Sequence, residues 1–532
     1  MRDDLPIVQS PRLSLSPHKN NSVEASSIRS SISSEYQDAL ILVPLLMCDS
    51  HEVDEPDVDR HVTVEMLPDE VLLEIFDYHR LDALDYSLFG PWEWHRLAHV
   101  CQRWRSLIFA SPRRLDLRLV YTYRRPVGKT LDCWPALPIA LWYPRLVLWR
   151  PLAAADEENV TSALIYSDRI REINLTMTSS LLEKLAALVQ EPFPALEFLR
   201  MGSQEMLGSV VLPDEFLGGS APRLRQIDLS GTAFPSLPRL LLSTRDLVSL
   251  QLDEIPHAGY FSPEALAVGL GATPQLKSLK VHFLSPTTCH DPESPRPRSL
   301  DRIVLPSFAD FQFRGDSEYL EGLVARLSAP LLEKVEIAFF DRLVFDIPQL
   351  CQFIDLTERL GTSPYLTSIW LWERGFSITH YFPHPSPRGT LRLQISCRDF
   401  ARRMASLTHI NKQLFPLASS VRRLEIEAHR PSSSPVDEVN PVQWLELFGL
   451  FVNVRRLELT GTLVPSMVAA IEQSMEDRRQ VFSALRDIHL RGTAMSRAIE
   501  AFIAARKLSG HLVSVHYAGE GFYDDWFWDQ EL

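Results

Sequence analysis

The sequence has few cysteines and no long apolar segment. Six cysteines are scattered over 532 residues, and no two of them form a C-x-x-C pair. This usage is typical of a reducing compartment, where thiols are buried or incidental. The apolar run at 39–48 is too short to span a bilayer, and residues 1–20 lack the pattern of a secretory signal. We therefore expect an intracellular protein, in the cytoplasm or the nucleus, with no membrane partner.

Basic charge is also in short supply. The chain has 54 basic against 68 acidic residues, a net charge of −14. Nucleic-acid binding needs an excess of Lys and Arg on some face, so this balance argues against a nucleic-acid partner. The basic run from Arg103 to Lys129 is interpreted as a face that is solvated or paired with local carboxylates.

The motifs of common catalytic and metal sites are missing. There is no nucleophile elbow, zinc-peptidase motif or dinucleotide fingerprint. Gly-Lys-Thr at 128–130 resembles the end of a P-loop, but Tyr123 stands where that motif needs glycine. His95 and His99 would share a helix face that Cys101 does not, and no fourth ligand is nearby, which argues against a metal site. Cys101 lies on an apolar stripe, so we expect it to pack in the core. We predict no catalytic residue, metal or cofactor.

Two amphipathic stretches predict a small helical module. Leu67-Pro68-Asp69-Glu70 has the features of a helix start, with Pro at an early position and carboxylates at the positive end of the helix dipole. An apolar stripe then follows on Val71, Leu72, Ile75 and Phe76. A second stripe, ended by Pro112, runs along Trp94, Leu97, Val100, Cys101, Trp104, Leu107 and Ile108. Such a module has more large apolar side chains than it can bury, which predicts a partner.

A repeat dominates the rest of the chain. The apolar pattern L-x-x-L-x-L, with Ile, Val or Met substituting, recurs at a mean spacing of about 29 residues, close to the leucine-rich-repeat range. Its copies begin at Ile170, Leu196, Leu224, Leu247, Leu276, Leu300, Leu332, Leu366, Val421, Val454 and Leu485, with a weak copy at Leu393-Ile395 and a possible last one at Leu512.

Helical stripes lie between these copies, as at 181–189, 320–327, 444–448 and 499–503. Strand followed by helix at this period predicts an α/β fold: a curved leucine-rich-repeat solenoid with a parallel sheet on its concave side and helices on its convex side. We expect loops at 285–299 and 430–440. The expected organisation is a disordered leader at 1–60, the helical module at 61–125, a connecting segment at 126–165, the irregular solenoid at 166–520 and an acidic-aromatic tail at 521–532, which we interpret as a cap on the last repeat.

Two ordered motifs resemble the F-box family. They are L-P-D-E-V-L-L-E-I-F at 67–76 and H-V-C-Q-R-W-R-S-L at 99–107, and the joint between them, 77–94, is longer than is usual in the family. With the repeats, the chain resembles a fungal-type F-box protein with C-terminal leucine-rich repeats. The resemblance implies binding to a Skp-type adaptor, and through it to a cullin–RING complex. It implies adaptor contacts at Leu67, Pro68, Glu70, Ile75, Phe76, Val100, Cys101 and Trp104.

The resemblance implies a non-catalytic substrate receptor of a ubiquitin ligase, with a client protein bound by the repeats. The alternatives are a repeat scaffold with no ubiquitylation role and an enzyme with an unrecognised site in a loop. Strand side chains alternate, so Trp370 and Trp372 would share one face, where Arg423 and Arg456 also lie. We predict client binding there, because aromatic and Arg side chains are frequent binding hot spots. The competing interpretation is that a loop at 375–388 covers the tryptophans.

Overall fold

The computed structural model describes most of the chain from Val64 to Ala518. The described ranges are 64–82, 97–111, 119–121, 137–143, 154–203, 210–286, 302–340, 346–383, 389–397, 399–428, 441–476, 481–491, 497–508 and 510–518. The expected leader, the loop at 430–440, most of the loop at 285–299 and the tail at 521–532 lie outside them.

Three short helices lie in the N-terminal part of the described chain. They are the 3₁₀-helix η2 (Val64–Met66) and the α-helices α1 (Asp69–Asp82) and α3 (Gln102–Ala110). The chain divides into two compact units, residues 1–67 and 68–532, so η2 belongs to the first unit and α1 to the second.

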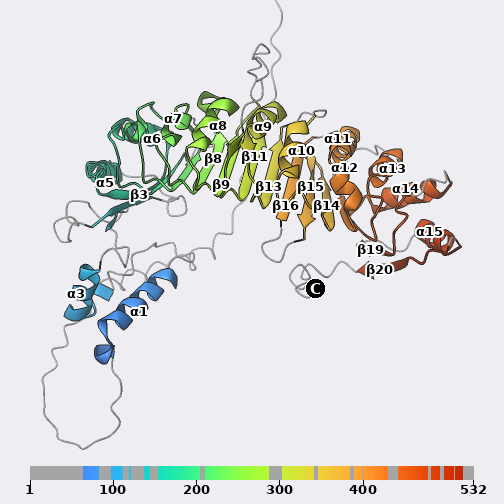
Figure 1. Cartoon of the computed structure of the whole chain (residues 1–532), viewed down its shortest axis with the longest axis horizontal. Coiled ribbons are helices and arrows are strands. Elements are labelled where there is room, and N and C mark those ends of the chain that lie inside the picture. The colour runs from blue at the N-terminus through green and yellow to red at the C-terminus, as the bar shows by residue number, and fades with distance from the viewer. Residues whose placement is uncertain are drawn as a thin grey trace, which may run out of the picture. The chain divides into compact units, whose positions relative to one another are not determined.

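A large, open, mainly parallel sheet organises the second unit (Figure 1). Its two ends are the strands β1 and β20. Helices alternate with many of its strands along the chain, which makes the chain a mixed α/β protein. In spatial order its strands are β1 (Leu119–Tyr121), β2 (Ile139–Tyr143), β3 (Ile170–Met177), β4 (Phe198–Ser203), β6 (Gln226–Ser230), β8 (Ser249–Ile255), β9 (Ser278–Phe283), β11 (Asp310–Gly315), β13 (Lys334–Phe339), β16 (Gly389–Ser396), β15 (Gly375–Phe382), β14 (Leu366–Trp372), β17 (Arg423–Ala428), β18 (Arg456–Thr460), β19 (Asp487–Arg491) and β20 (Ser514–Ala518).

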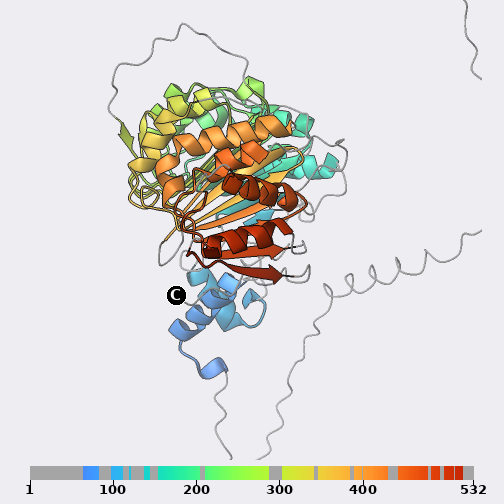
Figure 2. The same cartoon turned by 90° about the vertical axis from the view of Figure 1, so that its right-hand side faces the viewer.

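Helices cover one face of this sheet, and we call the other face the open face (Figures 1 and 2). Consecutive helices pack on each other, as α7 does on α8 and α13 on α14. The helices are α5 (Ala154–Leu164), α6 (Ser179–Leu188), α7 (Leu237–Leu241), α8 (Pro263–Gly271), α9 (Ser317–Val324), α10 (Pro348–Asp355), α11 (Phe400–Gln413), α12 (Phe415–Ser420), α13 (Pro441–Phe448), α14 (Val464–Glu476) and α15 (Arg497–Leu508), with the 3₁₀-helices η4 (Phe216–Gly219) and η5 (His257–Gly259).

The core lies between the helices and the sheet, and strand alternation explains it. In β9, Leu279 and Val281 are buried while Lys280 between them is half-exposed on the open face. Several turns from helix to strand contain the same type of side-chain hydrogen bond. The buried hydroxyls of Thr244 and Thr273 donate to carbonyls three residues earlier, at 3.0 and 2.8 Å. Each hydroxyl adds a second hydrogen bond to a carbonyl at the end of its helix, which also accepts from the backbone N–H of the same threonine.

One copy of the apolar pattern does not supply a strand of the large sheet. Ile303 lies in β10 (Ile303–Val304), which pairs only with β12 (Leu327–Ser328) in a separate two-stranded sheet. The strand between β9 and β13 is instead β11, whose core residues are Phe311 and Phe313, preceded by the buried Phe308. Phenylalanine takes all three apolar positions there, so a search for aliphatic residues misses the copy. A second small sheet joins β5 (Val210–Val211) to β7 (Thr232–Ala233).

The sheet is also not wholly parallel. The segment 375–382, one end of the loop expected to cover the tryptophans, forms β15, which is antiparallel to both β14 and β16. As a result β16, not β14, lies beside β13, and β14 lies beside β17. The weak copy at Leu393-Ile395 is a real strand, but it stands out of its order in the chain.

The sheet begins before the expected start of the repeats at 166. Strands β1 and β2 lie in the expected connecting segment or earlier, and they pair in parallel with each other and with β3. The boundary at 166 is therefore too late for the sheet.

Within the described ranges, no helix is both long and apolar enough to cross a membrane.

Candidate functional surfaces

Helix α1 has a buried face made by Leu72, Leu73 and Phe76. The Phe76 side chain is only 2% exposed, and its ring centroid lies 4.8 Å from that of Trp104 on α3. An ion pair adds to this contact, because Nη2 of Arg103 lies 2.6 Å from Oδ1 of Asp69 at the start of α1. Phe76 therefore belongs to the contact between α1 and α3. Although the resemblance implies an adaptor contact at Phe76, its side chain is buried within the chain itself.

A second face of α1 is apolar and exposed. Val71, Ile75 and Tyr78 follow one another at steps of four and three, which places them side by side on a helix. All three are exposed, and Ile75 is 45% exposed. We call these three residues the α1 face. Val71 and Tyr78 are absent from the predicted contact set, although the i, i+4, i+7 spacing is visible in the sequence.

Cys101 does not pack in a core, contrary to expectation. It is exposed and precedes α3, where its Sγ accepts a hydrogen bond from the backbone N–H of Trp104 at 3.4 Å. The stripe expected to run unbroken from 94 to 108 is interrupted by a turn at 99–100. The side chain thus acts as the N-cap of α3, a role usually filled by Ser, Thr, Asp or Asn.

The other predicted adaptor contacts differ in exposure. Pro68, Glu70 and Val100 are exposed, whereas Leu67 is half-buried. Trp104 is half-buried against Phe76. Their role in binding a partner stays a prediction. Among the residues that the structure describes, no three His, Cys, Asp or Glu side chains cluster as metal ligands, and His95 lies outside these residues.

The open face carries the predicted tryptophan pair near the end of β14. Trp370 is 42% exposed, and its ring centroid is 5.0 Å from that of Trp372. The backbone of β15 leaves room for the second ring at Gly375. A methyl group there would lie 2.7 Å from Cζ2 of Trp372 and would overlap the carbonyl oxygen of Ile395. The two indoles therefore form a partly exposed aromatic surface supported by a bare backbone.

The predicted arginines lie on the same face but at the other end of the strands. Arg423 is directly opposite Arg456 and opposite Leu366, four residues before Trp370. Each arginine is paired with the nearly buried carboxylate of Glu458, through Nη2 of Arg423 at 2.9 Å and Nε of Arg456 at 2.8 Å. The arginines are thus already engaged by a carboxylate, and they do not adjoin the tryptophans.

The pKa of Glu425, whose carboxyl lies beside this pair, differs from its ordinary value. Burial, opposed by Arg423, raises the pKa of Glu425. Arg491 also approaches Glu458, at 3.7 Å. Three guanidinium groups and two carboxylates therefore form one network on β17, β18 and β19. The network stabilises the face, and its guanidinium groups are already paired with carboxylates.

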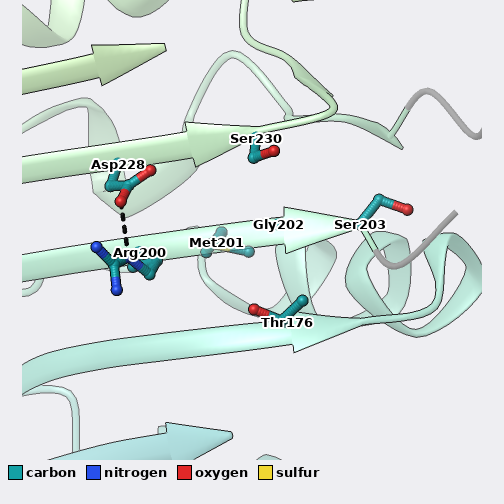
Figure 3. A pocket seen from close by; sticks show the side chains of 7 residues that line it. All are labelled: Thr176, Arg200, Met201, Gly202, Ser203, Asp228 and Ser230. Carbon is teal, nitrogen blue, oxygen red and sulfur yellow. Dashed lines mark hydrogen bonds and ion pairs between the residues drawn. The ribbon is translucent and has the colours of Figure 1, made fainter. Parts of the chain in front are cut away.

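A polar hollow lies near the other end of the open face, across the ends of β3, β4 and β6 (Figure 3). Arg200 donates from Nε to Oδ2 of Asp228 at 2.7 Å. Four of the remaining lining residues are small or polar, Thr176, Gly202, Ser203 and Ser230, and the fifth is the apolar Met201. Hydroxyl groups beside an ion pair can bind polar groups, but no histidine lines this hollow, and the carboxylate of Asp228 is engaged by Arg200.

Comparison with known families identifies the helical module. The F-box-like family model matches residues 64–117, the segment that contains α1, α3 and the exposed α1 face. No curated protein matches the chain. Residues 64–117 therefore form an F-box-like domain, joined to a large mixed α/β sheet domain.

Proposed function

We propose that this protein is a substrate-receptor subunit of a Skp–cullin–F-box ubiquitin ligase. The observation that carries the proposal is the α1 face, an exposed apolar stripe within the F-box-like domain. Val71 and Ile75 belong to an exposed apolar cluster, and such clusters mark interaction sites, so we expect a partner to cover them. A Skp-type adaptor is the partner that an F-box implies.

The predicted adaptor contacts fit this surface in part. Ile75 belongs to it directly, Pro68 is exposed immediately before α1, and Glu70 is exposed in the first turn of α1. Phe76 and Trp104 support it from behind by fixing α1 against α3. We propose that the adaptor covers the α1 face together with Leu67, Pro68, Val100 and Cys101.

The sheet domain is proposed to be a leucine-rich-repeat solenoid. A strand followed by a helix at a spacing of about 29 residues supports this assignment. We propose that the open face binds a client protein, with Trp370 and Trp372 as the principal contacts. Arg423 and Arg456 would contribute less, since Glu458 already engages both.

The receptor itself would perform no chemistry. By holding the client near a ubiquitin-charged enzyme supplied by the complex, it would raise the effective concentration of the acceptor lysine. A cullin and a RING protein would join through the adaptor. The alternative is a repeat scaffold that binds the adaptor, or nothing, and has no part in ubiquitylation.

Purification of the chain from cells, with detection of adaptor and cullin, separates these possibilities. The receptor should bring down both proteins, and the double variant Leu67→Ala with Pro68→Ala should bring down neither. A scaffold would be recovered without cullin. Adaptor recovery unchanged by the double variant would reject the F-box assignment.

A further inference from the structure

The tryptophan pair and Arg314 are the two ends of one row across the open face. The strand register places Arg314 opposite Ala338, and Ala338 opposite Gln394. The row continues from Gln394 to Ser377 and from Ser377 to Trp370. We call these five residues the Arg–Trp row. Its ends are an arginine and an indole, and two of the three side chains between them are as short as Ala and Ser.

Arg314 is exposed, and its charge is not compensated by a nearby acid. Within the described residues, no carboxylate forms an ion pair with it. Across the sheet, the carboxylate of Asp253 is already engaged: it accepts a hydrogen bond from Nζ of Lys280 at 2.7 Å and lies 3.1 Å from Nδ1 of His282, the residue opposite Arg314. The hydrogen bond to His282, with that from Lys280, holds the pKa of Asp253 well below its usual range.

Arg314 is also held in place. Its guanidinium carbon lies 5.7 Å from the centroid of the Phe340 ring, which is half-buried on the same face. Such a cation–π contact reduces the freedom of the side chain while leaving its N–H groups available. A fixed, uncompensated guanidinium is suited to a carboxylate, because binding then costs little ordering entropy.

A second row lies beside the first, and its residues next to the tryptophans also have short side chains or none. Ser396 is opposite Gly375, and Gly375 is opposite Trp372. Ser377 is only 3% exposed, and Gly375 is buried against the ring of Trp372. The surface that a client would contact at this end of the row is therefore the indole rings and not the sheet backbone.

We propose that the Arg–Trp row recognises an extended client segment with one acidic residue at Arg314 and one large apolar residue on Trp370 and Trp372. This proposal rests on the proposed receptor function and names the chemistry of its client. Four strand-to-strand steps of about 4.8 Å separate the ends, about 19 Å in all, which an extended segment spans with about six residues. The uncompensated charge at Arg314 is single, so it matches a carboxylate rather than a doubly charged phosphate.

Fluorescein-labelled peptides test this with the full-length protein. Each would contain one Glu and one Trp in a Gly-Ser background, separated by zero to nine residues, and fluorescence polarisation would report binding. Affinity should peak when about five residues separate Glu from Trp. Replacing Glu by Gln should weaken the best peptide about tenfold, the range of a charge-assisted hydrogen bond, and replacing Glu by phosphoserine should not strengthen it.

Protein variants assign the two ends. Arg314→Gln should remove the preference for Glu over Gln, and Trp370→Ala with Trp372→Ala should remove the preference for Trp. Arg200→Gln is the matched control, because Arg200 is on the open face of β4 and paired with Asp228. It should leave the affinity unchanged.

Three results would overturn the inference: affinity independent of spacing, no effect of Arg314→Gln, or a phosphoserine peptide binding about tenfold tighter than the Glu peptide. Absence of binding by every peptide would overturn it too. Adaptor binding, measured on the same preparation, would then show whether the receptor function itself stands. Loss of adaptor binding with peptide recognition intact would reject only the receptor function.

Discussion

Phe76 and Trp104 join α1 to α3 through rings whose centroids are 4.8 Å apart at an angle of 59°. Next to Phe76, Ile75 points away from this contact and is 45% exposed. Two neighbouring apolar residues on one helix thus have separate tasks. One stabilises the contact between the helices, and the other is available for binding.

This separation predicts different effects for the two residues. Phe76→Ala should destabilise the packing of α1 on α3 by about 3–5 kcal/mol, the usual loss for a buried Phe. Ile75→Ala should change it by less than about 0.5 kcal/mol, because that side chain is exposed. Amide hydrogen exchange in α1 and α3 measures both. Equal protection in the two variants would contradict the assignment of Phe76 to the buried contact.

Gly375 should not tolerate a side chain. In Gly375→Ala the new methyl group must displace Trp372 or the backbone at Ile395, which should lower the free energy of unfolding by about 1–3 kcal/mol. Gly271→Ala in α8 is the matched control, since its methyl group would meet Ile303 at 3.4 Å, an ordinary contact. The control should be neutral or slightly stabilising. Urea unfolding compares them, and equal stability would mean that Gly375 has no such constraint.

Much of the sheet could be predicted from the sequence, because an apolar pattern of period two shows where each strand buries its side chains. The prediction failed at one strand, β11, where the core residues are aromatic and not aliphatic. Phe311 and Phe313 fill two core positions normally taken by smaller aliphatic residues, while Ile303 fits the pattern but lies in a separate pair of strands.

The order of β14, β15 and β16 was not predictable in this way. The pattern in each strand says which face is buried, but it does not say which neighbour the strand pairs with. Of the candidate surfaces, the tryptophan pair could be found from its spacing, whereas Arg314 could not. Its relation to Trp370 depends on register across four strands.

The hairpin around β15 should make the protein sensitive to acid. His380 is fully buried, with Nδ1 2.8 Å from Oγ1 of Thr367, and burial lowers the pKa of His380 to about 4. In the unfolded chain a histidine has a pKa near 6.5, so between these values the unfolded state binds more protons. Stability is therefore complete above about pH 6.5 and falls as the pH drops towards 4, by about 3 kcal/mol in total.

His380→Asn should remove this part of the pH dependence, because Asn can still hydrogen-bond to Thr367 but does not titrate. His511→Asn, at an exposed position, is the control and should leave the profile unchanged. Chemical unfolding at intervals between pH 4 and pH 7.5 measures all three proteins. A profile for His380→Asn as steep as that of the natural sequence would show that other groups cause the acid sensitivity.

The most direct test of the receptor assignment is the affinity of the full-length protein for a purified Skp-type adaptor, measured by isothermal titration calorimetry. Ile75→Asp places a carboxylate in the centre of the α1 face, and burying that charge under the adaptor should weaken binding at least tenfold, by about 1.4 kcal/mol or more. Val268→Asp on α8 replaces an exposed apolar residue outside the F-box-like domain, and this variant should bind like the natural sequence. Equal affinity for Ile75→Asp and the natural sequence, with α1 still folded by hydrogen exchange, would contradict the account.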